Sequence, residues 1–124
     1  MTNSPDALHG YHIHIYYNDE TKPIAEKLRA SLASQFPVQL GANTGIAGPH
    51  PVGQLPVIFK KEVFGRIVPW LMLNREGLDI LIHPLSEDEY DDHGANAVWL
   101  GTPVALKMDT LPHGPYPKHL LPAA

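Results

Sequence analysis

The sequence predicts one α+β domain built on a small antiparallel sheet. Three observations predict it. Short segments rich in β-branched and aromatic residues recur along the chain, two longer segments between them have helical periodicity, and glycines and prolines separate the elements. A chain of 124 residues has the length of a single domain. We therefore interpret residues 1–124 as one domain, with a core over about residues 10–106 and a proline-rich tail over residues 107–124.

The first two elements have the clearest patterns. Residues 11–17 alternate in character with period two, which predicts a central strand. A helix is expected to follow, because Pro23 suits a first helical turn and Pro37 stops the pattern. Its apolar stripe recurs every four residues, at Ile24, Leu28 and Leu32.

The remaining elements complete a β-α-β-β-α-β order. They are expected over residues 38–40 (strand), 55–59 (strand), 62–75 (helix) and 78–83 (strand). This order predicts the ferredoxin-like fold, an antiparallel sheet with both helices on one face. A C-terminal extension follows, in which residues 97–100 and 104–106 are candidates for an additional edge strand.

Composition excludes several classes of function. There are no cysteines, which excludes disulfides, thiolate metal ligands and cysteine nucleophiles. The net charge of −4 and the scattered lysines and arginines argue against nucleic acid as a partner. No apolar run is long enough to cross a membrane, and the N-terminus does not resemble a secretory signal, so we expect a cytoplasmic protein.

Histidines are the residues most suited to chemistry in this chain, which contains eight. His12 and His14 share one face of the first predicted strand, the face that the helices should leave uncovered. Two imidazoles so placed can hold a metal ion together with a third histidine or a carboxylate. His83, at the end of the fourth predicted strand, is the first choice for that third ligand. The alternative is that these histidines are half-exposed sheet residues bonded to their neighbours.

Two further histidines are candidates for acid–base or substrate-binding roles. His50 lies between two prolines that limit its backbone, although the same segment is also typical of a plain turn. His93 follows two aspartates in an acidic loop, where a carboxylate can orient the imidazole. A solvated acidic turn is the alternative for this loop.

Several separated motifs occur together in a fixed order. They are residues 11–17 (YHIHIYY), 48–51 (GPHP), 69–75 (PWLMLNR), 83–85 (HPL) and 92–101, which begins with Asp92-His93 and ends with Trp99-Leu100-Gly101. Taken together, these segments resemble the DOPA 4,5-dioxygenase family over roughly residues 10–106. The resemblance implies a ferredoxin-like fold and extradiol cleavage of a catechol, such as DOPA, by a non-haem metal and O2.

We combine this resemblance with the residue pattern in one hypothesis about roles. Iron(II) is expected on His12, His14 and His83, with zinc or nickel as adventitious occupants of an imidazole site. His50 and His93 are assigned as the catalytic acid–base groups. Tyr16 is expected to stack on the substrate ring and Arg75 to pair with a substrate carboxylate, although Arg75 also suits the end of a helix.

The competing hypothesis is a domain without turnover. In this interpretation a ferredoxin-like domain binds a metal or small ligand on the open face of its sheet, since fold alone does not decide function. A homodimer is expected under either hypothesis, because an uncovered sheet face needs cover.

Overall fold

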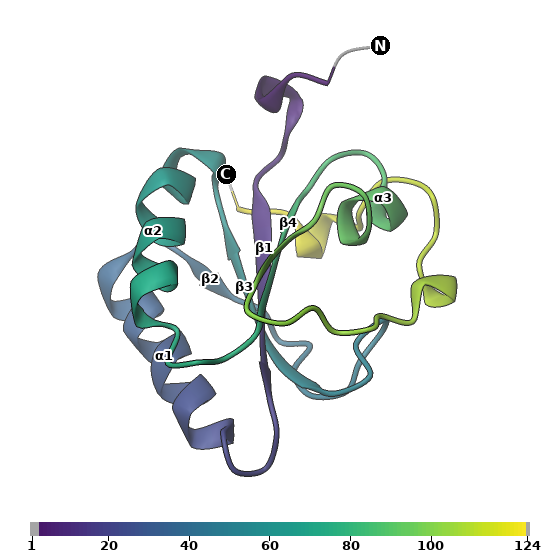
Figure 1. Cartoon of the computed structure of the whole chain (residues 1–124). Coiled ribbons are helices and arrows are strands. Elements are labelled where there is room, and N and C mark those ends of the chain that lie inside the picture. Colours follow the sequence, from purple (N-terminus) through teal and green to yellow (C-terminus); the bar gives the residue numbers. More distant parts are fainter. Residues whose placement is uncertain (1–2, 124) are drawn as a thin grey trace.

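The computed structural model describes residues 3–123 of the chain. Over this range the chain forms five strands and three α-helices, arranged in an α+β fold (Figure 1). In chain order they are β1 (Tyr11–Tyr17), α1 (Lys22–Gln35), β2 (Gln39–Leu40), β3 (Gly53–Phe59), α2 (Phe64–Asn74), β4 (Ile80–Pro84), α3 (Glu89–His93) and β5 (Val98–Leu100). None of the helices in residues 3–123 combines the length and the apolar character needed to cross a membrane.

The strands form a single antiparallel sheet in the order β2-β3-β1-β4-β5. Strand β1 is central, as its alternating pattern predicts, and it pairs with β3 on one side and β4 on the other. The β-α-β-β-α-β order from β1 to β4 is also as predicted. Of the two candidate edge strands, residues 98–100 pair with β4, whereas residues 104–106 form no strand.

The long helices α1 and α2 cover one face of the sheet (Figure 1). Their apolar stripes pack on the side chains of β1 that point to this face, Ile13 and Ile15. In α1 the buried residues are Ala25, Leu28 and Leu32, and in α2 they are Ile67 and Leu71. This packing buries every second side chain of β1 in the main core and leaves the intervening side chains, His12 and His14, on the opposite face.

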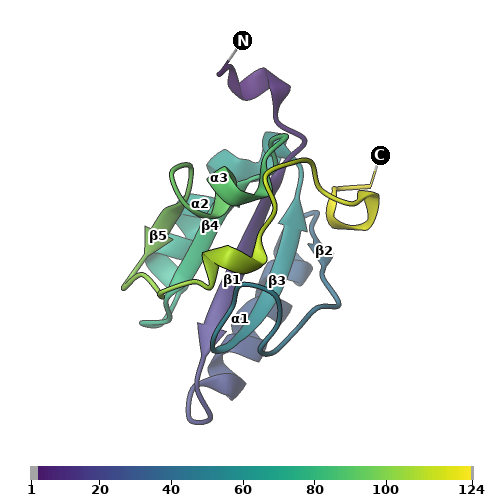
Figure 2. The same cartoon turned by 90° about the vertical axis from the view of Figure 1, so that its right-hand side faces the viewer.

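The opposite face is not open, which corrects the prediction of an uncovered surface. Figure 2 shows α3 and the C-terminal segment lying across the sheet on the side away from α1 and α2. A second, smaller core forms there from Ile58, Leu85 and Tyr116, with Leu120 and Leu121 packed against it. The predicted tail is therefore part of the packed structure. Because the argument for a homodimer depended on an uncovered face, that argument is wrong, and the homodimer itself stays a prediction.

Candidate metal centre

Five buried histidines gather between the sheet and the C-terminal segment. Their side chains are between 0% and 7% exposed, and they come from β1, β4, α3 and the loop that joins β2 to β3. They are His12, His14, His50, His83 and His93. All five histidines that the sequence predicted for metal binding or acid–base catalysis are thus in one place.

Strand register explains three of these positions. His12 lies directly opposite His83 in the antiparallel pair of β1 and β4, so both side chains point to the same face. His14 is two residues further along β1 and shares that face. The ring centroids of His12 and His83 are 5.2 Å apart, and those of His14 and His83 are 5.3 Å apart.

The other two histidines reach the cluster from outside the sheet. His50 is held in a turn, in which its backbone N–H donates to the carbonyl oxygen of Ala47, and its ring centroid is 4.2 Å from that of His14. His93 is the last residue of the short helix α3, and its ring centroid is 4.0 Å from that of His83. The segment around His93 is helical, so the expectation of an acidic loop there is wrong.

Gln54 determines which nitrogen of His14 is available. The side-chain amide nitrogen of Gln54 donates to the carbonyl oxygens of Asn43 and Gly45, at 2.7 and 3.2 Å. Its amide oxygen therefore faces Nδ1 of His14, at 2.8 Å. Because an amide oxygen can only accept, Nδ1 of His14 carries the hydrogen, and Nε2 keeps its lone pair.

Backbone carbonyls determine the tautomers of three more histidines in the same way. Nδ1 of His83 donates to the carbonyl oxygen of Pro84, and Nδ1 of His93 donates to that of Glu89, at 2.9 and 2.8 Å. Both rings keep the lone pair on Nε2. Nε2 of His12 donates to the carbonyl oxygen of Leu120, at 2.8 Å, which leaves the lone pair of His12 on Nδ1. Four imidazoles thus each offer one free nitrogen, as metal-ligating histidines do.

Ring nitrogens of these histidines are close enough to share one ion. The ligand atoms of His12, His14 and His83 lie within 4.8 Å of one another, and so do those of a second set, His14, His50 and His93. Nε2 of His14 and Nε2 of His83 are only 3.2 Å apart. Two nitrogens that each lie about 2.1 Å from one metal are separated by roughly 3.0–3.4 Å for ligand angles between square and tetrahedral. The residues therefore fit a metal ion held by imidazole nitrogen.

Burial keeps all of these imidazoles neutral. Removal from water is the main cause that lowers the pKa of His12 to about 4 and the pKa of His50 to about 3, and repulsion from neighbouring histidines contributes to both shifts. Burial lowers the pKa values of His14 and His83 well below the usual 6.5, and it also lowers that of His93. The neutral form is the one that binds metals, so no proton competes for these nitrogens near neutral pH.

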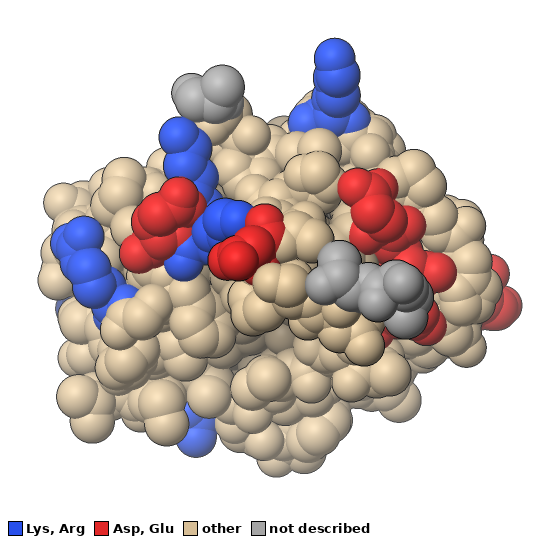
Figure 3. Space-filling model, turned by 90° about the horizontal axis from the view of Figure 1, so that it is seen from above, with Lys and Arg blue, Asp and Glu red and all other residues tan. Residues whose placement is uncertain are grey.

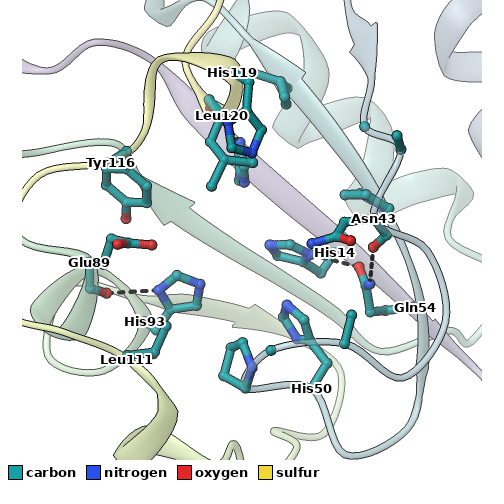
Figure 4. A pocket seen from close by; sticks show the side chains of 18 of the residues that line it. His14, Asn43, His50, Gln54, Glu89, His93, Leu111, Tyr116, His119 and Leu120 are labelled. Carbon is teal, nitrogen blue, oxygen red and sulfur yellow. Dashed lines mark hydrogen bonds between the residues drawn. The ribbon is translucent and has the colours of Figure 1, made fainter.

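A cavity of about 670 Å³ opens beside the cluster. Figure 4 shows His14, His50 and His93 directed into it from different elements. His12 also lines the cavity, whereas His83 is fully buried behind it. Apolar wall is supplied by Ile58 of β3 and by residues of the C-terminal segment, including Leu111, Pro112 and Leu120. A cavity of this size and lining suits a small organic ligand beside the histidines.

The two predicted substrate-binding residues are placed differently from expectation. Tyr16 is buried, its hydroxyl shares a 2.7 Å hydrogen bond with Nδ1 of His50, and its ring stacks on Trp99. It therefore supports His50 and does not line the cavity. Arg75 lies at the end of α2, donates to the carbonyl oxygen of Leu78 and is not among the cavity residues either. The structure does not bring Arg75 to the histidines.

Asp92 does not orient His93, contrary to the prediction. Its buried carboxylate accepts hydrogen bonds from Ser86, Asn96 and the hydroxyl of Tyr116. The orienting acceptor is the carbonyl oxygen of Glu89, one helical turn before His93. Asp92 instead ties α3 to the segments that flank it.

Sequence reasoning missed three residues of this site: Gln54, Glu89 and Tyr116. One signal was available for Gln54. Residues two apart on a strand share a face, so Gln54 lies on the same face as Pro56 and Ile58, which line the same cavity. Glu89 and Tyr116 lie in segments without periodicity, where the sequence has no pattern to assign a face.

Comparisons with known proteins identify similar sequences and structures. Residues 11–110 match the model of the Dopa 4,5-dioxygenase family. A DOPA 4,5-dioxygenase of Amanita muscaria is 30% identical over 112 residues, and an uncharacterized 21.2 kDa protein of Botryotinia fuckeliana is 33% identical over 112 residues. A crystal structure from Nostoc punctiforme, described as a candidate dioxygenase, is 40% identical, with a TM-score of 0.83.

The extent of these matches differs between relatives. The Amanita match covers 82% of this chain but 49% of the relative, and the Botryotinia match covers 79% of this chain and 61% of the relative. This chain thus spans about half to three-fifths of the length of these curated relatives. The Nostoc match covers 88% of this chain and 96% of that chain, so the two are similar over nearly their whole lengths.

Proposed function

Because the chain belongs to the Dopa 4,5-dioxygenase family, we propose that it is a metal-dependent extradiol dioxygenase that opens the ring of a catechol with O2. DOPA or a related dihydroxyphenyl compound is the proposed substrate. The metal is held in the histidine cluster, and the catechol occupies the adjacent cavity.

The observation that carries the proposal is the contact between Nε2 of His14 and Nε2 of His83. Both nitrogens bear lone pairs at a separation of 3.2 Å, and a cation relieves their mutual repulsion. A ring nitrogen of His12 lies within 4.8 Å of ring nitrogens of both, which makes a set of three histidines. We therefore keep His12, His14 and His83 as the proposed ligands.

A second set of histidines could also hold the metal. His14, His50 and His93 also have their ligand atoms within 4.8 Å of one another, and all three line the cavity. His14 is common to both sets, so its substitution removes the metal under either assignment. His83 and His50 belong to one set each, so their substitution distinguishes the two.

Iron(II) is the proposed metal. When bound, iron supplies Lewis acidity toward the catechol hydroxyls and the redox activity that O2 chemistry requires and zinc lacks. The donor set contains imidazole nitrogen and no thiolate, a combination that also accepts zinc or nickel.

The chain's own residues supply the proton transfers and the positioning. His93 faces the cavity with a free Nε2, which we propose accepts a hydroxyl proton from the catechol and returns it later. His50 binds the substrate from the other side, with its ring held by the hydroxyl of Tyr16. The ring of Tyr116 and the apolar wall of the cavity exclude water from the reacting ring.

We also propose that the fold is ferredoxin-like, extended by β5 and the C-terminal segment. The strand order β2-β3-β1-β4 and the position of both long helices on one face support this. A homodimer remains a proposal that needs a measurement of mass in solution.

Ring cleavage is tested by reconstituting the protein with iron(II) under anaerobic conditions and then adding oxygenated catechols. DOPA, caffeate, protocatechuate and 4-methylcatechol form a suitable panel. We expect oxygen uptake with a yellow ring-opened product from at least one of them. His14→Gln should reduce the rate at least about a hundredfold, since it removes a ligand under either assignment.

His9→Gln is the matched control, because His9 pairs with Glu87 on the surface, outside the cluster. It should retain the rate of the unmodified protein. If a protein with confirmed iron loading takes up no oxygen with any catechol, the dioxygenase proposal fails. Metal and catechol binding without turnover would instead favour a non-catalytic binding domain.

A further inference from the structure

The cavity lacks the positive charge that was expected to bind a substrate carboxylate. None of the described lining residues is a lysine or arginine, and Arg75 lies elsewhere. Among the lining residues that the structure describes, Glu89 alone carries a carboxylate. When a substrate is bound at the metal, its side chain therefore lies near a carboxylate, which can be negatively charged. It lies near no lysine or arginine.

Glu89 is held close to the cluster by the helix that carries His93. It is the first residue of α3, and its backbone carbonyl accepts the hydrogen bond from Nδ1 of His93. Figure 4 shows its carboxylate in the cavity wall, between the hydroxyl of Tyr116 and the ring of His93. A ligand seated on the histidines therefore has this carboxylate within reach of its substituents.

The Glu89 carboxylate has no hydrogen-bond or ion-pair partner within residues 3–123. Its acidic neighbours do have hydrogen-bond partners. Asp92 accepts from the side chains of Ser86, Asn96 and Tyr116. Asp88 accepts from His113 and from the backbone N–H of Asp91. Partial burial raises the pKa of Glu89, and the charge of Asp92 raises it further. Both effects oppose the charged carboxylate, and a cation beside it offsets them.

The surface around α3 adds to the same preference. Figure 3 shows acidic side chains gathered on the side of the molecule where Figure 1 places α3. The sequence supplies five carboxylates within six residues there; Glu87, Asp88, Glu89 and Asp91 are at least partly exposed, whereas Asp92 is buried. Such a surface attracts cationic ligands and repels anionic ones.

We propose that Glu89 binds an ammonium group on the side chain of the catechol, so that the site selects catechols with an amine side chain over catechols with a carboxylate side chain. This inference rests on the proposed function, because it takes the catechol ring to lie on the histidines. An amino-acid side chain carries both charges and should bind with intermediate affinity.

Binding measurements test this selectivity without turnover. Protein loaded with zinc, which has no redox chemistry, is titrated by calorimetry with three catechols of similar size: dopamine, neutral 4-ethylcatechol and anionic 3,4-dihydroxyphenylacetate. We expect dopamine to bind at least about tenfold more tightly than 4-ethylcatechol, the ratio typical of one charge-assisted hydrogen bond. The anionic catechol should bind most weakly.

Glu89→Gln should abolish the preference for dopamine and leave the affinity for 4-ethylcatechol within about twofold, since the amide keeps the shape of the side chain without its charge. Asp91→Asn is the matched control. It removes an exposed charge of the same helix that does not line the cavity, and the preference should persist.

The outcomes separate this inference from the proposed function. If 4-ethylcatechol binds but dopamine has no advantage, or if Glu89→Gln keeps the advantage, the Glu89 inference is overturned and the catechol site stands. Loss of the advantage in Asp91→Asn also overturns it, because the surface field would then be responsible. If none of the three catechols binds, the proposed function fails and the inference fails with it.

Discussion

Nε2 of His14 lies 3.2 Å from Nε2 of His83, and each nitrogen keeps its lone pair because the other nitrogen of its ring donates to an oxygen acceptor. The acceptors are the amide oxygen of Gln54 and the carbonyl oxygen of Pro84. Two facing lone pairs in a buried site are unfavourable unless a cation lies beside them. A bound metal ion therefore stabilises this arrangement of the two imidazoles.

Metal binding should stabilise the fold and identify the ligands. At a metal concentration about 100 times Kd, a single site adds about 2.7 kcal/mol to the free energy of unfolding. For a domain of this size that raises Tm by roughly 10 °C. Thermal scans with and without zinc should show this shift in the unmodified protein and in His9→Gln, and should show none in His14→Gln.

The same scans distinguish the two ligand sets. If His12, His14 and His83 hold the metal, His83→Gln abolishes the shift while His50→Gln keeps most of it. The reverse pattern would assign the metal to His14, His50 and His93. Equal shifts in all of these variants would place the metal outside the cluster.

Gln54 should act on the metal through His14. Gln54→Leu removes both the oxygen acceptor for Nδ1 of His14 and the donors to Asn43 and Gly45. We expect a loss of about 1–3 kcal/mol in the free energy of unfolding, because two carbonyl oxygens then lose their donor. Metal affinity should fall about tenfold to a hundredfold, as is usual for residues that orient a ligand. Unchanged affinity measured by calorimetry would restrict Gln54 to a structural role.

Tyr116 should stabilise the C-terminal segment through Asp92. Its hydroxyl donates to the fully buried carboxylate at 2.8 Å, so Tyr116→Phe leaves that carboxylate with one donor fewer. We expect the free energy of unfolding, measured in urea, to fall by about 1–3 kcal/mol. Tyr90→Phe is the control and should change it by less than about 0.5 kcal/mol, since no hydrogen bond of its hydroxyl is found in residues 3–123. Equal effects of the two variants would contradict this role.

Acid should destabilise the metal-free protein through the histidine cluster. Unfolded histidines titrate near 6.5, whereas the pKa is about 4 for His12 and about 3 for His50 in the folded chain. Over the interval between these values the unfolded chain binds more protons than the folded chain. The free energy of unfolding should therefore stay level above about pH 7 and fall as the pH drops from about 6.5 toward 4.

Urea titrations of the metal-free protein at several pH values measure this dependence. His12→Asn removes one of the titrating groups, so its stability should fall less steeply over the same interval. A stability that is constant from about pH 7 to about pH 4 would contradict the neutral, buried state of the cluster.

The sequence was sufficient to predict the main strands and helices and the shared face of the two histidines on β1. Period-two alternation placed His12 and His14 on one face of β1. The pairing of β4 with β1, which sets His83 opposite His12, was not predicted and is a finding of the structure. The positions of His12 and His14 follow from local periodicity, whereas that of His83 depends on which strands pair in the sheet. The resemblance to the family added the expectation that His50 and His93 belong to the same site.

The parts that could not be predicted depend on segments without periodicity. The C-terminal segment packs through isolated residues, Tyr116 and Leu120, separated by prolines and turns, so no repeating pattern reveals the buried face. Asp92 and His93 are adjacent in sequence, yet the turn of α3 directs them to different partners. Arg75 was expected to pair with a substrate carboxylate, but its side chain donates to the carbonyl oxygen of Leu78 beyond the end of α2.

The most direct test of the account is a crystal structure of the iron-loaded protein, with anomalous data collected at the iron edge. We predict one strong anomalous peak within bonding distance of Nε2 of His14 and Nε2 of His83, with an open side facing the cavity. A fully loaded protein whose anomalous peak lies away from His14 would contradict the central claim that this histidine cluster is the metal centre.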